Sequence, residues 1–71
     1  MRKTAMEKRG RASALDYAYL VFNESRKLNP EQQSNEFAMA RFAIEARNEA
    51  MEKYGIRIAL ICDDSGMWGF A

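Results

Sequence analysis

A chain of 71 residues has room for one small domain, which buries only about 60% of the surface that its unfolded chain exposes and is marginal as a monomer. One cysteine and no histidine exclude an internal disulfide and a Cys₂His₂-type zinc site, so oligomerisation remains the usual source of added stability. The net charge of +1 hides an asymmetry, because residues 1–11 carry five basic groups and one acidic group and the remaining residues are acidic overall.

Residues 1–12 are predicted to form a basic N-terminal arm, followed by a single domain over residues 13–71. Gly10 interrupts the helical pattern of the arm, and terminal segments of this composition are commonly mobile. Cations in such an arm could contact phosphate groups, so nucleic-acid binding is the alternative function of the chain. Nothing in the arm is suited to reading bases. Its basic residues are Arg2, Lys3, Lys8, Arg9 and Arg11.

The first helix is expected to begin near Ser13, because Ser13 and Asp16 resemble a capping box, and to end near Lys27. Its apolar residues fall on one broad face at about 100° per residue. A helix of this pattern buries that face against a neighbour. The residues of the face are Ala14, Leu15, Tyr17, Ala18, Val21, Phe22 and Leu28.

The second helix is predicted from Pro30 to about Tyr54, with Asn29 as its N-cap and Gly55 as its C-terminal cap. Its apolar arc covers roughly half of the circumference, so we expect it to pack on more than one element. The arc contains Phe37, Met39, Ala40, Ala43, Ile44, Ala46, Ala50, Met51 and Tyr54.

Arg47 falls within the apolar arc of the second helix and has two interpretations. It extends outward or pairs with a carboxylate such as Glu36, Asp16 or Glu24. Alternatively, it offers its planar guanidinium group to an anionic group of a partner.

After Gly55 the pattern changes to that of a β-hairpin. The segment "IRIALIC" is β-branched and apolar, "DDSG" is turn chemistry, and "MWGFA" can return as a second strand. The predicted fold class is therefore α+β: an antiparallel two-helix hairpin followed by a C-terminal two-stranded β-hairpin packed on the helices.

The turn of this hairpin contains the residues most suggestive of chemistry. Asp63 and Asp64 favour a turn because their side chains bond to nearby backbone N–H groups, whereas a metal site would need more oxygen ligands. Cys62 has no histidine or second cysteine to activate it, so it is expected to be a small apolar strand residue. We expect no metal, no cofactor and no enzymatic activity.

Two turn registers are compatible with the hairpin, a type I turn over residues 63–66 with a bulge at Gly66 or a two-residue loop at Ser65–Gly66. Both are expected to give one face with Ile56, Ile58, Leu60, Cys62, Met67 and Gly69, and another with Arg57, Ala59, Ile61, Trp68 and Phe70. Both faces are apolar, so one of them needs a cover other than the helices. The alternative is a closed core in which Trp68 packs beneath a helix.

These observations predict a small protein-binding module, a regulator, adaptor or inhibitor of a larger protein, at a scale common among phage and mobile-element products. Trp68, Phe70 and Ile61 are the predicted apolar anchors, and Arg57 is predicted to orient them. The exposed edges of the hairpin predict self-association. The single cysteine is typical of a reducing compartment, so we expect a cytoplasmic protein. No segment is apolar enough to indicate contact with a membrane.

Overall fold

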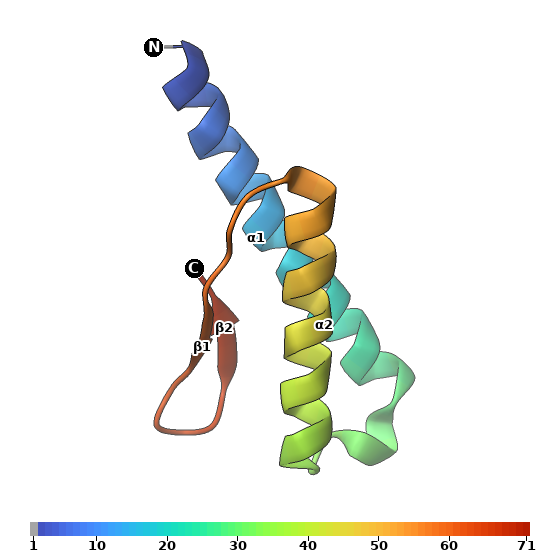
Figure 1. Cartoon of the computed structure of the whole chain (residues 1–71). Helices are drawn as coiled ribbons and strands as arrows, with labels where there is room; N and C mark the ends of the chain where they lie inside the picture. Colours follow the sequence, from blue (N-terminus) through green and yellow to red (C-terminus); the bar gives the residue numbers. More distant parts are fainter. Residues whose placement is uncertain (1) are drawn as a thin grey trace.

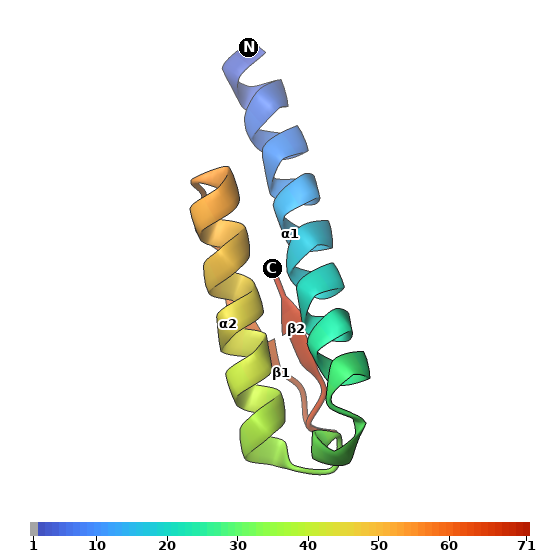
Figure 2. The same ribbon diagram turned by 90° about the vertical axis from the view of Figure 1, so that its right-hand side faces the viewer.

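The computed structural model describes the backbone of residues 2–71 and the side chains of residues 10–71. Helix α1 (Arg2–Leu28) and helix α2 (Glu36–Tyr54) form an antiparallel pair (Figure 1). Strands β1 (Leu60–Cys62) and β2 (Trp68–Phe70) form an antiparallel hairpin. Figure 2 shows two layers, with the helix pair in front and the hairpin behind it. The predicted α+β fold class is confirmed.

Helix α1 begins at Arg2, well before the start predicted near Ser13. Most residues of the predicted arm are good helix formers, and one interior glycine costs only about 1 kcal/mol, so Gly10 does not end the helix. The side chains of residues 1–9 lie outside the described residues. The division into a mobile arm and a domain stays a prediction.

The connection between the helices contains two helix starts, at Pro30 and at Glu36, where the sequence predicted one. The segment Pro30–Gln32 forms a single 3₁₀ turn, η1, and the side chain of Asn29 does not cap it. Asn29 Nδ2 instead donates to the carbonyl of Ser25 at 2.9 Å, which satisfies the end of α1. Asn35 is the true N-cap of α2, since its Oδ1 accepts from the N–H groups of Phe37 and Ala38. The second helix was predicted to begin at Pro30, whereas α2 begins at Glu36, after the 3₁₀ turn and a short loop.

The end of α2 is as predicted. Gly55 adopts the left-handed conformation, with φ of +66°, and its N–H donates to the carbonyl of Met51 at 2.7 Å. Only glycine adopts this conformation without a steric cost, so the helix ends here and the chain turns toward the hairpin.

The core lies between the two layers and contains small residues where the helices meet. Five alanines from α1 and α2 are fully buried, which indicates that the two backbones approach closely. Phe22, Ile58 and Phe70 fill the wider space between the helices and the hairpin. The rings of Phe22 and Phe70 meet edge to face, with centroids 6.1 Å apart. The alanines are Ala14, Ala18, Ala43, Ala46 and Ala50.

Part of the apolar arc of α2 is left uncovered by the described residues. Phe37 and Ile44, both members of the arc, are 81% and 40% exposed. The arc is thus wider than α1 and the hairpin together can bury. The expectation that this helix packs on more than one element is confirmed, because α2 contacts α1, β1 and β2. The uncovered part of the arc lies on the side of α2 away from α1.

Candidate protein-binding surface

The two aspartates of the hairpin form turn structure, as predicted. Asp63 Oδ1 accepts hydrogen bonds from Ser65 Oγ at 2.6 Å and from the N–H groups of Ser65 and Met67, both at 2.9 Å. The Ser65 hydroxyl, followed by the Met67 N–H, holds the pKa of Asp63 below its usual value, because each of these bonds favours the ionised carboxylate. Within residues 10–71 no cluster of three or more His, Cys, Asp or Glu side chains could hold a metal ion.

Of the two turn registers left open by the sequence, the structure has the type I turn with a glycine bulge. The N–H of Gly66 donates to the carbonyl of Asp63 at 3.0 Å, and Gly66 has φ of +86°. The N–H of Asp63 in turn donates to the carbonyl of Met67, so these two residues are paired across the strands. The loop between the paired residues Asp63 and Met67 therefore contains three residues, an odd number.

This odd loop changes which side chains share a face, and the predicted grouping was wrong. The observed pairs are Leu60 with Phe70, Ile61 with Gly69 and Cys62 with Trp68. Directly paired residues project to the same side of a sheet, so Trp68 and Phe70 lie with Leu60 and Cys62. The prediction had overlooked that the bulge residue adds one position and reverses the parity of the second strand.

The four predicted anchors are consequently separated. Phe70 is only 6% exposed and belongs to the core, and Trp68 is half-buried beside it on the inner face. Ile61 projects from the opposite face and is 48% exposed. Arg57 is exposed and precedes β1. Of the predicted apolar anchors, only Ile61 lies fully on the solvent side of the hairpin.

The solvent side of the hairpin is nevertheless apolar. We define the outer face as the residues that project away from the helices. Ile61 and Met67 are its large side chains, and Met67 is 58% exposed. Among the described residues, the Tyr19 hydroxyl of α1 reaches this face at Gly69, and the large side chains of Ile61 and Met67 stay exposed. Its residues are Ala59, Ile61, Met67, Gly69 and Ala71.

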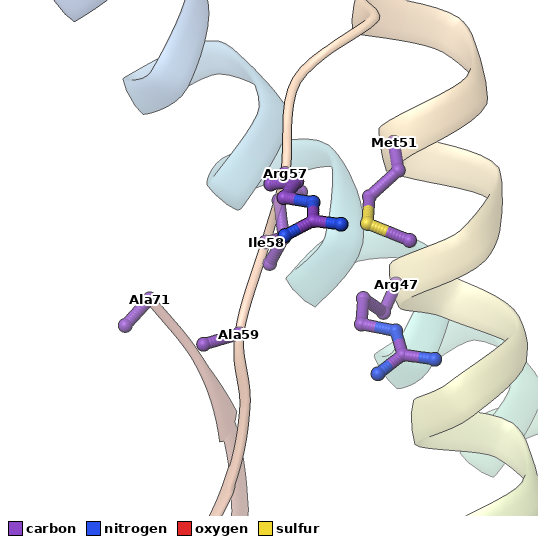
Figure 3. Close-up of a pocket in the computed structure, with 6 residues that line it drawn as sticks. All are labelled: Arg47, Met51, Arg57, Ile58, Ala59 and Ala71. Atoms are coloured by element: carbon purple, nitrogen blue, oxygen red, sulfur yellow. The ribbon is translucent and has the colours of Figure 1, made fainter.

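A second uncovered surface lies where α2 borders β1. We define the α2 flank as Phe37, Ala40, Ile44, Arg47 and Met51, which recur at intervals of three and four residues along one side of the helix. Arg47 and Met51 line one open groove with Arg57, Ile58 and Ala59 (Figure 3). Phe37 and Ala40 line another with Cys62 and Trp68. The α2 flank and β1 thus border each other at both ends.

The arginines of the first groove have no acidic partner among the described residues. Arg47 donates from Nε and Nη2 to Asn48 Oδ1, at 3.3 and 3.2 Å, rather than to any of the predicted carboxylates. In Figure 3 the side chain of Arg57 extends from the segment before β1 toward Met51 of α2, and Arg47 lies below Met51 on the same helix. This arrangement leaves two cations at one end of an apolar groove.

The structure also shows where Cys62 and Arg11 lie. Cys62 lies in β1, as expected, but it is exposed at the end of the strand instead of packed inside. Arg11 is the one arm cation whose side chain is described, and its Nη1 donates to the carbonyl of Arg57 at 3.0 Å. The other four cations lie outside the described side chains, and their role stays a prediction.

Sequence patterns alone did not identify the contact made by Tyr19. Its hydroxyl accepts from the N–H of Phe70 at 3.0 Å and lies 3.5 Å from the Phe70 carbonyl, which covers the outer edge of β2. No periodic signal distinguishes this tyrosine from Tyr17, which lies two residues earlier.

No family model, curated protein or solved structure matches the chain. Among the described residues, no helix has both the length and the apolar character needed to cross a membrane.

Proposed function

We propose that this chain is a small cytoplasmic protein-binding module, which acts as a regulator, adaptor or inhibitor by occupying a surface of a larger protein. The observation that supports this proposal is the outer face, where the large apolar side chains of Ile61 and Met67 lie exposed on the side of the sheet that faces away from the helices. Apolar patches of this kind commonly mark interaction sites.

The roles of the anchors follow from their positions. Ile61 and Met67 insert into an apolar depression of the partner, and the neighbouring small residues Ala59 and Gly69 allow its surface to approach the hairpin backbone. Arg57 lies at the margin of this face and pairs with an acidic group of the partner. Trp68 and Phe70 support the hairpin from the inner side, so their contribution to binding is indirect.

Affinity capture from the native host, followed by mass spectrometry, tests this function. The wild-type chain is compared with Ile61→Lys, which places a charge on the outer face, and with Leu20→Lys, which makes the same change at an exposed position of α1. We expect a partner that Leu20→Lys retains and Ile61→Lys loses by at least tenfold in affinity. A partner retained equally by both variants contradicts the use of the outer face.

Nucleic-acid binding is the second proposal, and it is favoured by the way the first turns of α1 extend beyond the other elements (Figure 1). A projecting helix with several cations would contact phosphates, and its affinity would fall steeply with salt. Replacing Arg2, Lys3, Lys8 and Arg9 by Gln, then titrating DNA and RNA at two salt concentrations, tests this. Absence of salt-sensitive binding by the wild-type chain rejects it.

A further inference from the structure

The hairpin has one covered edge and one open edge. The outward-facing backbone groups of β2 at Phe70 are engaged by the hydroxyl of Tyr19. Just before β1, the backbone groups of Ala59 bond to those of Ala71. Because such groups alternate along an extended chain, those of Ile58, Leu60 and Cys62 point away from β2. Within the described residues these outward groups have no hydrogen-bond partner. An open strand edge is a template for pairing with another strand.

The α2 flank lies alongside this open edge. Arg57 and Ile58, near the start of the extended segment, border Arg47 and Met51, whereas Cys62 borders Phe37 and Ala40. Helix and strand therefore run in opposite directions, and Ile44 falls between the two grooves at the level of the middle of β1. The uncovered apolar side chains of α2 and the unpaired backbone of β1 form one continuous surface.

We propose that a second copy of this chain occupies this surface, with the two β1 strands paired antiparallel about a two-fold axis at Leu60. In this register Leu60 pairs with Leu60 of the second copy, and Ile58 pairs with Cys62 on either side. These are the residues whose backbone groups point outward, so each pair exchanges both of its hydrogen bonds. The two hairpins then form one four-stranded sheet. Its edge strands are the two β2 strands, each covered at Phe70 by the Tyr19 hydroxyl of its own copy.

Charge complementarity favours a second copy over an unrelated strand. Pairing about Leu60 places Arg57 opposite Asp63 of the second copy, next to Asp64. Neither Arg47 nor Arg57 has an acidic partner among the described residues, and the carboxylate of Asp64 makes no hydrogen bond there. The acidic turn of each copy thus meets the arginine end of the groove in the other. An unrelated strand would need to supply this acidic group itself.

The α2 flanks of the two copies would also match each other across the two-fold axis. The α2 flank is symmetric about Ile44, since Phe37 and Met51 are each seven positions from it. The two-fold axis brings Ile44 next to Ile44 of the second copy and Phe37 toward Met51. Spacing of three and four residues is that of a helix–helix seam. Phe37, which is 81% exposed in the single chain, becomes covered.

Analytical ultracentrifugation across a concentration series tests this dimer with the full chain. We expect a reversible monomer–dimer equilibrium that Ile44→Lys weakens at least tenfold, because two lysines meet at the axis. Leu20→Lys, at an exposed apolar position on α1, should leave the equilibrium unchanged. A monomer at every concentration up to the millimolar range overturns the proposal. Equal effects of the two lysine variants do so as well.

Cross-linking tests the register. In a Cys62→Ala background, Ala59→Cys and Ile61→Cys together place cysteines opposite each other across the proposed interface, at a pair without hydrogen bonds where side chains are close. Mild oxidation should give a covalent dimer with both cysteines present and little with either alone. Efficient cross-linking by Ile61→Cys alone contradicts pairing about Leu60. Apart from Arg57, this surface and the outer face use different large side chains: Phe37, Ile44 and Met51 here, and Ile61 and Met67 there. A chain that fails to dimerise therefore leaves the proposed function to be tested by its own experiment.

Discussion

Asp63 shows how one side chain determines the hairpin turn. Its Oδ1 accepts three hydrogen bonds, two from Ser65 and one from Met67. The residue itself is exposed. Because the ionised form accepts these bonds, the pKa of Asp63 is lower in the folded chain than in the unfolded chain. Its contribution to stability is therefore complete above the unfolded pKa of about 3.9 and lost as the pH falls through the lowered pKa.

We expect Asp63→Ala to lower the urea midpoint of unfolding at neutral pH, as followed by Trp68 fluorescence. This difference from wild type should shrink as the pH falls through the lowered pKa of Asp63. Asp63→Asn keeps an oxygen acceptor and should lose mainly the acid dependence. Asp64→Ala is the matched control, because the neighbouring carboxylate makes no hydrogen bond to a described residue. A difference that persists unchanged in acid would show that the charge of Asp63 is not involved.

At the scale of the elements, a single hydroxyl joins helix α1 to strand β2. The ring of Tyr19 packs edge to face on Phe70, with centroids 4.9 Å apart, and its hydroxyl bonds to the same residue's backbone. A Cβ at Gly69 would lie 3.0 Å from this oxygen, so glycine at that position allows the close approach. The hairpin is thus held to the helices by a polar contact as well as by its inner face.

Tyr19→Phe should lower the free energy of unfolding by about 1 kcal/mol, because it leaves the N–H of Phe70 without its partner while preserving the ring. Faster amide hydrogen exchange at Phe70 should accompany the loss. Tyr17→Phe is the control, since the ring of Tyr17 packs on Tyr54 and its hydroxyl bonds to no described residue. Equal losses in the two variants would mean that the Tyr19 hydrogen bond adds nothing measurable.

At the scale of the whole molecule, the closeness of the two helices depends on alanine. Fully buried alanines on both helices leave no space for a larger side chain at the contact. Protein interiors are close-packed, so added methyl groups force the backbones apart. Any separation of the helices would also disturb the contact between Phe22 of α1 and Phe70 of β2.

Ala46→Leu should therefore destabilise the fold by about 1–3 kcal/mol, the usual cost of overpacking, as measured by thermal and urea unfolding. Ala12→Leu places the same side chain on an exposed position of α1 and should change stability by less than about 0.5 kcal/mol. If Ala46→Leu is tolerated as well as Ala12→Leu, the helices are not in the tight contact described.

The order of the elements and the end of α2 could be predicted from the sequence, and the hairpin turn was limited to two registers, one of which is observed. Each depends on residues that act on their own neighbourhood: the left-handed Gly55, the Asp63 side chain with its turn and the positive φ of Gly66. The helix starts were less accurate, because Asn29 and Asn35 are both plausible caps and local chemistry does not rank them. Periodicity also indicated correctly that the arc of α2 exceeded what one neighbour could cover.

The side of the hairpin that each anchor occupies was decided by the tertiary structure. Trp68 and Phe70 lie inward because the three-residue loop sets their pairing with Cys62 and Leu60, and a shift of one position reverses every side chain of the strand. Tyr19 reaches β2 only because the helix and the strand, distant in the chain, pack together. Local preferences determined which elements form, but the choice between a buried and an exposed anchor depended on contacts between residues far apart in the sequence.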